Sequence, residues 1–141
     1  MIFRWAPSNI GPYSQAKTLG KRVVLVSGQI ALDPPTMVLG GGGQVVDEAK
    51  ICLSNLEAIL KVCGSSISDG VRLTAYVVSM GDAKGALEAW REAGGRGSAN
   101  AVCVRQLPRG AKVMSHFTLP QIPWIGNYLK VAIDCDVRQQ T

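Results

Sequence analysis

The sequence has one histidine, which limits the bond-breaking chemistry that its side chains could carry. His116 is the single histidine and no cluster of acidic residues accompanies it, so we expect no metal site made of protein ligands. A serine nucleophile would need the same histidine as its base, and the sequence has no Gly-x-Ser-x-Gly elbow. We therefore predict that His116 is a structural residue on a strand.

A run of glycines, Gly40–Gly43, precedes an expected helix and could present free backbone N–H groups to a phosphate. The run lacks the Lys-Ser/Thr pair of a P-loop and the spacing of a dinucleotide fingerprint. The residues favour a flexible loop instead, and no cofactor is expected.

The cysteines show no C-x-x-C spacing, and each lies inside an apolar segment. They are Cys52, Cys63, Cys103 and Cys135. We interpret them as buried free thiols rather than as a disulfide pair, which suits a reducing cytosol.

Targeting signals for a membrane or for secretion are not visible. The uncharged stretch Val113–Leu129 is interrupted by Pro120 and Pro123 and is too polar to span a bilayer. The first residues show no basic region followed by an apolar run, as a secretory signal would. We expect a cytoplasmic protein that does not contact the membrane.

The composition favours an assembly of several copies. Apolar residues make up 47% of the chain and charged residues 18%, whereas about a quarter of an average domain is charged. The net charge of +5 could indicate a nucleic-acid partner, but only Lys17, Lys21 and Arg22 cluster, and no aromatic residues alternate with them. Nucleic acid is therefore not the expected partner.

Two segments have helical periodicity. Val45–Cys63 is apolar on one face and is followed by Gly64, a natural helix end. Asp82 is expected to cap a second helix that Gly94 ends, and its inner face carries Ala83, Ala86, Leu87 and Trp90.

Strand patterns occupy the rest of the chain. They cover Arg22–Gln29, Val71–Ser79, Asn100–Gln106, Lys112–Leu119 and Tyr128–Val137. Turns made by proline and glycine are expected at Asp33–Thr36 and Leu107–Gly110. The order predicts one α/β (α+β) domain over residues 1–141, with a single mixed sheet covered by two helices. Residues 120–141 are expected to form an atypical extension or a displaced last strand.

The free face of that sheet needs a cover. Val23–Val26 is apolar on both sides of the expected strand, whereas a strand with one solvated face alternates apolar and polar residues. A second subunit is the predicted cover.

Two N-terminal motifs carry a resemblance to a known family. Ile10–Ala16 reads IGPYSQA and Val26–Pro34 reads VSGQIALDP. They resemble the opening of the reactive-intermediate deaminase (Rid/YjgF) family, which also carries the label endoribonuclease L-PSP. Asn55-Leu56 and Leu107–Gly110 follow in the same order, so the resemblance covers about residues 5 to 119. Trp5–Ser8 and Asp33–Met37 resemble one branch, the Rid-like C-terminal domain of eukaryotic diphthine–ammonia ligase.

The resemblance implies a chorismate-mutase-like fold and a homotrimeric barrel with small-molecule pockets at the subunit clefts. The ligand would be a small carbonyl, imine or carboxylate-like molecule. Active members hydrolyse reactive enamines and imines, such as 2-aminoacrylate, to 2-keto acids and ammonia. A guanidinium fork binds the substrate carboxylate through parallel hydrogen bonds. A backbone group and a carboxylate then position the attacking water.

The match to the family's ligand-binding positions is partial. Tyr13 is present in its motif, as an active-site hydroxyl or as an aromatic packed near the subunit seam. Ser27, Gly28 and Gln29 are also present, and Gly28 would let the backbone approach a ligand closely.

The residues expected from the last two strands are absent. Eight residues before Leu107, the place of the pocket arginine is taken by Ala99, and the following cysteine position is Ala101. The nearest arginines, Arg96 and Arg105, are offset from that place by three and six positions.

The glutamate is missing as well. Its position is Met114, seven residues after Leu107. If Val113–Tyr128 is an insertion, the position is instead Ala132, with Asp134 two residues on.

Without the guanidinium fork, carboxylate binding loses charge-assisted hydrogen bonds worth roughly 1.5–3 kcal/mol each. We therefore expect a Rid-like small-ligand-binding or assembly domain without the usual deaminase residues. If the chain belongs to the branch named above, this domain would be part of a diphthine–ammonia ligase, an enzyme of diphthamide biosynthesis. Two alternatives stay open: a 2-iminobutanoate/2-iminopropanoate-type deaminase (a hydrolase) with altered specificity, and an endoribonuclease or translation inhibitor.

Overall fold

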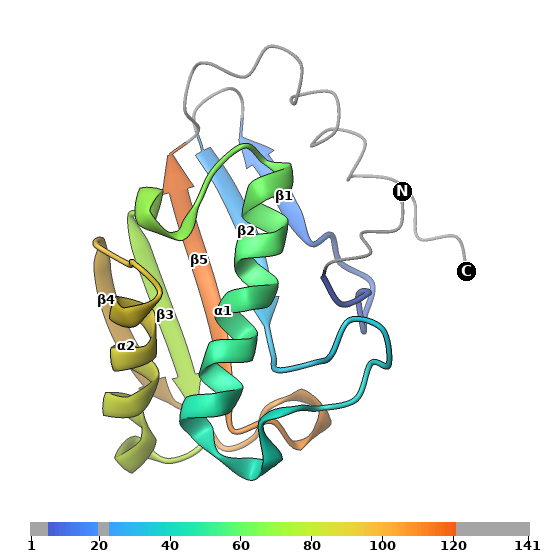
Figure 1. Ribbon diagram of the computed structural model, residues 1–141, viewed down its shortest axis with the longest axis vertical. Coiled ribbons are helices and arrows are strands. Elements are labelled where there is room, and N and C mark those ends of the chain that lie inside the picture. The colour runs from blue at the N-terminus through green and yellow to red at the C-terminus, as the bar shows by residue number, and fades with distance from the viewer. Residues whose placement is uncertain (1–5, 20–22, 121–141) are drawn as a thin grey trace.

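A computed structural model of the protein describes residues 6–19 and 23–120 (Figure 1). The strands are β1 (Ala16–Leu19), β2 (Val23–Gln29), β3 (Arg72–Val77), β4 (Ser98–Cys103) and β5 (Val113–Pro120). The helices are α1 (Val45–Val62) and α2 (Ala83–Glu92). Short 3-10 turns cover Gly41–Gly43, Ile67–Asp69, Met80–Asp82 and Pro108–Gly110. The predicted strand Tyr128–Val137, which includes Ala132 and Cys135, lies outside the described residues.

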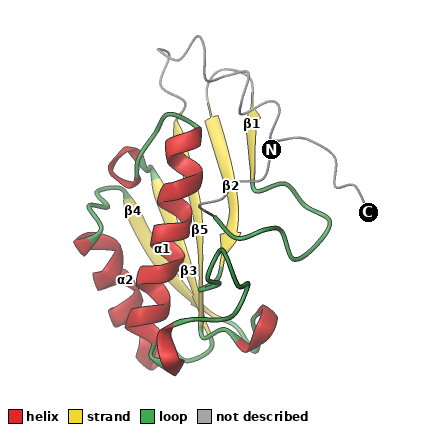
Figure 2. Ribbon diagram, turned by 45° about the vertical axis from the view of Figure 1, so that its right-hand side comes forward, coloured by secondary structure: helices red, strands yellow, loops and turns green. Residues whose placement is uncertain are grey.

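The strands form one mixed sheet in the order β1-β2-β5-β3-β4. β3 and β4 are parallel because α2 makes the crossover between them, and the other neighbours are antiparallel. The prediction of a single mixed sheet covered by two helices is confirmed (Figure 2).

β5 is the central strand. It pairs with β2 on one side and with β3 on the other, so residues 113–120 join the two halves of the sheet. The sequence left two candidates for the position of the missing glutamate, Met114 and Ala132. The structure places Met114 on the central strand, opposite Tyr76 of β3.

α1 packs its predicted apolar face on β2 and β5. Two polar residues on that face, Glu48 and Asn55, are also buried. Glu48 Oε2 accepts a hydrogen bond of 2.8 Å from the backbone N–H of Lys112, which compensates part of the cost of burying a carboxylate. The glycine run forms a 3-10 turn that packs closely on the start of α1, since a Cβ at Gly41 would lie 2.7 Å from Glu48 Cγ.

α2 covers β3 and β4 through Trp90, which is 1% exposed. The Trp90 ring meets Phe117 edge-on, with 5.2 Å between the ring centroids. The predicted helix start at Asp82 is confirmed, but the capping bond from its side chain is absent. Asp82 stands at the N-cap position, but its side chain makes no capping hydrogen bond, because the preceding 3-10 turn has already bent the backbone into helical angles.

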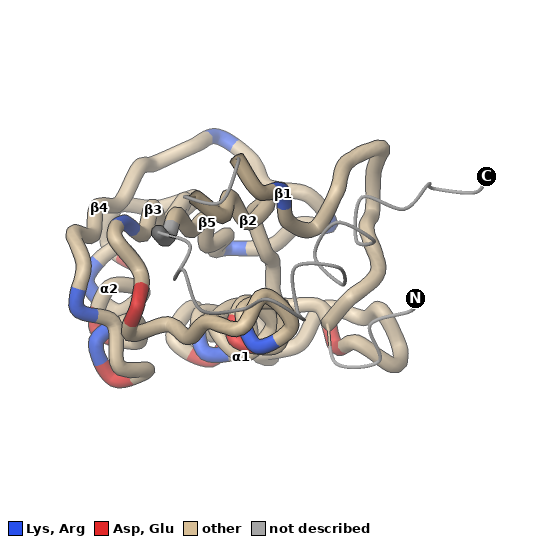
Figure 3. The backbone as a smooth tube through the Cα atoms, turned by 90° about the horizontal axis from the view of Figure 1, so that it is seen from above, with Lys and Arg blue, Asp and Glu red and all other residues tan. Residues whose placement is uncertain are grey.

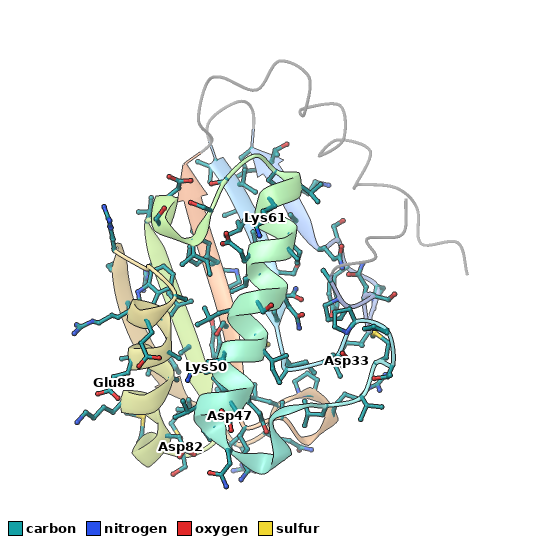
Figure 4. All side chains as sticks on the ribbon, in the orientation of Figure 1. Asp33, Asp47, Lys50, Lys61, Asp82 and Glu88 are labelled. Carbon is teal, nitrogen blue, oxygen red and sulfur yellow. The ribbon has the colours of Figure 1, made fainter. Side chains whose placement is uncertain are left out.

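The molecule has two layers, with both helices on one side of the sheet (Figure 3). Leu73, Val77 and Phe117 face the helices and are buried. Tyr76 and His116 alternate with them on the other side and are half-buried. The strands contain no acidic residue, so the described carboxylates lie on helices and loops. Figure 4 shows Lys50, Lys61 and Glu88 on the helix layer.

The outer strands and the cysteines differ in detail from the predictions. The sequence did not predict β1, and β4 begins and ends earlier than expected. The expectation of buried thiols holds for Cys52, but Cys63 is half-buried and Cys103 is exposed. Cys103 is exposed because it ends an edge strand, which has no neighbour on one side.

Candidate functional site

A small cleft lies where the end of β2 meets the N-terminal segment and the loop before β5. Its volume is about 40 Å³, which is room for a few water molecules. It is lined by Pro7, Ser8, Asn9, Ile10, Tyr13, Gly28, Gln29, Ile30, Leu32, Pro108 and Met114. The two sequence motifs therefore meet in space, and none of these described lining residues carries a charge.

Gly28 forms part of the cleft wall opposite Met114. A Cβ at Gly28 would lie 2.7 Å from Met114 Sδ, so the Met114 side chain packs directly against the bare backbone of Gly28. β2 bulges at this point, because the pairing with β5 shifts register between Val26 and Gln29. Bulges re-aim backbone groups next to ligand sites, and here the bulge turns the backbone of Gly28 toward the cleft.

Tyr13 lies at the mouth of the cleft and is 41% exposed. Its hydroxyl accepts a long hydrogen bond of 3.4 Å from the backbone N–H of Ile10, so the phenolic proton remains available to a ligand. The Asn9 amide donates to the Tyr13 carbonyl and fixes the turn that carries the ring.

The neighbours of Gly28 have different positions. Gln29 is buried and lines the cleft, and its amide donates to the Ser27 carbonyl at 3.2 Å. Ser27 lies outside the cleft lining, and its hydroxyl donates to the carbonyl of Ser14. The Ser27 side chain thus joins the two motif segments to each other.

Asn55 holds the cleft floor from behind. Its amide donates to the carbonyls of Ile30 at 3.3 Å and Leu32 at 2.9 Å, and both residues line the cleft. The sequence signal for this role was a polar residue on the apolar face of a helix. The lining residues from the N-terminal segment and from the loop before β5 gave no such signal.

Ala99 and Ala101 do not reach this cleft. They lie on β4, which is separated from β2 by β5 and β3, or about 14 Å at ordinary strand spacing. Arg96 precedes β4 and Arg105 follows it, and both are exposed. Within one chain, the structure therefore brings together Tyr13, Gly28, Gln29 and Met114, but not the β4 positions.

Among residues 6–19 and 23–120, no cluster of metal-binding side chains is present. Burial raises the pKa of the Cys52 thiol, and the nearby charge of Glu48 raises it further, so this thiol stays protonated and unreactive. The described helices are all too short or too polar to cross a membrane.

His116 lies on the open face of β5, opposite Thr74, and burial lowers its pKa below 6.5. The unfolded chain therefore binds more protons than the folded chain just below pH 6.5, so stability rises with pH in this window. We expect the wild type to lose stability relative to His116→Gln as the pH falls below about 6.5. Urea unfolding at pH 5.5 and 7.5 checks this, and a difference that does not depend on pH would contradict it.

A family model named Endoribonuclease L-PSP matches residues 3–114 of the chain. The chain belongs to this family. It is 38% identical over 122 residues to the mouse 2-iminobutanoate/2-iminopropanoate deaminase. The aligned residues cover 85% of this chain and 89% of the mouse protein. The predicted membership of the Rid/YjgF family is confirmed, whereas the comparison gives no support to the diphthine–ammonia ligase branch.

Solved structures of the L-PSP family have the same fold. RidA from a Psychrobacter species is 30% identical, with a TM-score of 0.76 over 83% of this chain and 94% of RidA. TdcF from E. coli with bound serine is 28% identical, with a TM-score of 0.76 over 84% of this chain and 95% of TdcF. The five-stranded mixed sheet with two helices is therefore the chorismate-mutase-like Rid fold.

Proposed function

We propose that the protein hydrolyses small imines or enamines to a carbonyl compound and ammonia. The observation that carries this proposal is the cleft formed by Tyr13, Gly28 and Gln29, in a chain 38% identical to a mouse deaminase of 2-imino acids. The proposed activity is that of a deaminase with altered specificity, the first of the two alternatives that the sequence left open.

The reaction needs little machinery and no cofactor. Water adds to the carbon of the C=N bond, the resulting carbinolamine expels ammonia, and the 2-oxo acid remains. The Tyr13 hydroxyl has a proton to donate to the ligand, and backbone carbonyl groups of the cleft lining can orient the water. Binding of serine to TdcF indicates that small polar amino-acid-like molecules fit this fold.

The active cleft is proposed to lie between copies of the chain. A volume of about 40 Å³ is too small for a 2-imino acid, so one chain supplies only part of the site. The open sheet face and the exposed edge strand β4 are free for a second copy, and β4 of that copy would bring residue 99 to the cleft. A homotrimer in the cytoplasm, as implied by the resemblance, is the assembly we propose.

The specificity is expected to differ from that of the mouse enzyme. Ala99 and Met114 stand where the resemblance implies a carboxylate-binding arginine and a water-positioning glutamate. The lining of the cleft is neutral, so the substrate carboxylate needs another cation and the water relies on backbone groups.

The same two substitutions favour a second candidate, a domain that binds small ligands or supports an assembly without turnover. Membership of a diphthine–ammonia ligase stays a prediction from the sequence. Ribonuclease activity ranks last, because the described cleft residues include no acid–base pair, although the family name contains the word endoribonuclease.

The test is ammonia release from freshly generated 2-iminobutanoate and 2-aminoacrylate. We expect release by the wild type, and a higher rate for Ala99→Arg, which restores the anion-binding group. Ala93→Arg adds the same charge at the exposed end of α2 and should leave the rate unchanged.

A silent wild type contradicts the proposed hydrolysis. In that case, release by Ala99→Arg would show an intact pocket and would support the binding-domain candidate.

A further inference from the structure

Arg109 follows Pro108 in the turn at the rim of the cleft. Its neighbour Pro108 lines the cleft, and consecutive Cα atoms are only about 3.8 Å apart. Both residues belong to the 3-10 turn Pro108–Gly110, which connects β4 to the central strand β5. The turn that ends one side of the cleft therefore carries a long cationic side chain.

The backbone of Arg109 is strained. Its φ of 60° and ψ of 15° lie in the left-handed region, which glycine and asparagine adopt far more readily than arginine. Gly110 follows with a φ of 71°, so the turn requires this conformation at two successive residues. An arginine at the first of them is kept against a backbone cost, and such strained residues cluster at ligand sites.

Arg109 is also an available charge. It is exposed, and within the described part of the chain no carboxylate pairs with it. Lys112, the next cation along the chain, is engaged, because its Nζ donates to the Gly43 carbonyl at 2.6 Å. The neutral cleft thus has one unpaired guanidinium in the turn at its rim.

We propose that Arg109 supplies the guanidinium that binds the carboxylate of the ligand in this cleft. The inference rests on the proposed function, because it concerns the same cleft. Two parallel N–H donors of a guanidinium match the two oxygens of a carboxylate. The anion-binding group has then moved from β4 to the turn after it, and the ligands are 2-imino and 2-oxo acids rather than neutral imines.

The test compares the binding of 2-oxobutanoate with that of its neutral primary amide, 2-oxobutanamide, by isothermal titration calorimetry of the full chain. Arg109→Gly should weaken binding of the acid about tenfold or more, as expected for lost charge-assisted hydrogen bonds, and binding of the amide less than about twofold. Arg109→Lys, which keeps the charge but not the fork, should lie between wild type and Arg109→Gly.

Stability separates this role from a structural one. Arg109→Gly relieves the left-handed backbone, so its thermal midpoint should equal or exceed that of the wild type while its affinity for the acid falls. Arg91→Gln, an exposed arginine on α2, should bind like the wild type.

Unchanged affinity of Arg109→Gly for 2-oxobutanoate overturns the inference, as does an equal loss for the acid and the amide. Wild-type protein that binds neither compound overturns it too. Ammonia release that does not depend on Arg109 would leave the proposed function standing and reject this inference. If binding of the acid depends on Arg109 but the protein releases no ammonia, this inference stands and the proposed function is rejected.

Discussion

Trp90→Ala is expected to lower the free energy of unfolding by about 3–5 kcal/mol, the range for removing a large aromatic residue from a core. Trp90 is 1% exposed and fills the space between α2 and the sheet. The variant loses the edge-on contact with Phe117 and leaves a cavity.

Urea unfolding followed by circular dichroism measures this loss. Val38→Ala provides the control, since Val38 is 62% exposed and its truncation should change stability by less than about 0.5 kcal/mol. Trp90→Phe keeps an aromatic ring at the site and should lie between the two, which preserves the test if the alanine variant does not fold. A loss below about 1 kcal/mol for Trp90→Ala would contradict the described packing.

Gly28→Val is expected to lower kcat/KM for ammonia release by about 100-fold, the usual scale when a reacting group is displaced by about 1 Å. Even a single Cβ at this position lies 2.7 Å from Met114 Sδ, and two further methyl groups would take up much of a cleft of about 40 Å³. The side chain would thus exclude the ligand rather than weaken one contact.

The double variant Gly28→Val/Met114→Ala tests this cause. Removing the methionine side chain returns volume to the cleft, so part of the lost kcat/KM should come back. Gly81→Val adds the same side chain at an exposed turn, where a Cβ meets only Ser79 Oγ at 3.7 Å, and should leave kcat/KM unchanged. Full activity of the single variant would show that the reaction takes place elsewhere.

The sequence predicted the elements whose pattern is set by burial. α1 follows its apolar periodicity closely, and β2 and β3 follow their runs of apolar and β-branched residues, because these side chains are buried against the core. β1 was missed because its four residues include an exposed lysine and form a strand only by pairing with β2. Cys103 was expected to be buried because it lies in an apolar segment. The sequence does not reveal that this cysteine ends an edge strand, where it is exposed.

The candidate site was predictable only in part. Tyr13, Gly28 and Gln29 were identified by motif, and the structure places them in one cleft. Leu32 and Pro108 belong to the quoted motifs but were not assigned to the site, because their contribution depends on how separate loops meet in space. Ala99 and Ala101 were grouped with the site by motif order, yet the strand order places them at the far edge of the sheet.

The central place of β5 has a consequence for synthesis on the ribosome. Before residues 113–120 emerge, β1 with β2 and β3 with β4 are two separate pairs, and two-stranded sheets are only marginally stable alone. The growing chain therefore exposes the apolar faces of both pairs until its last described strand leaves the exit tunnel. Chaperones that shield nascent apolar segments would act on this chain until β5 has been synthesised, and a premature stop before β5 would leave two unjoined halves for proteolysis.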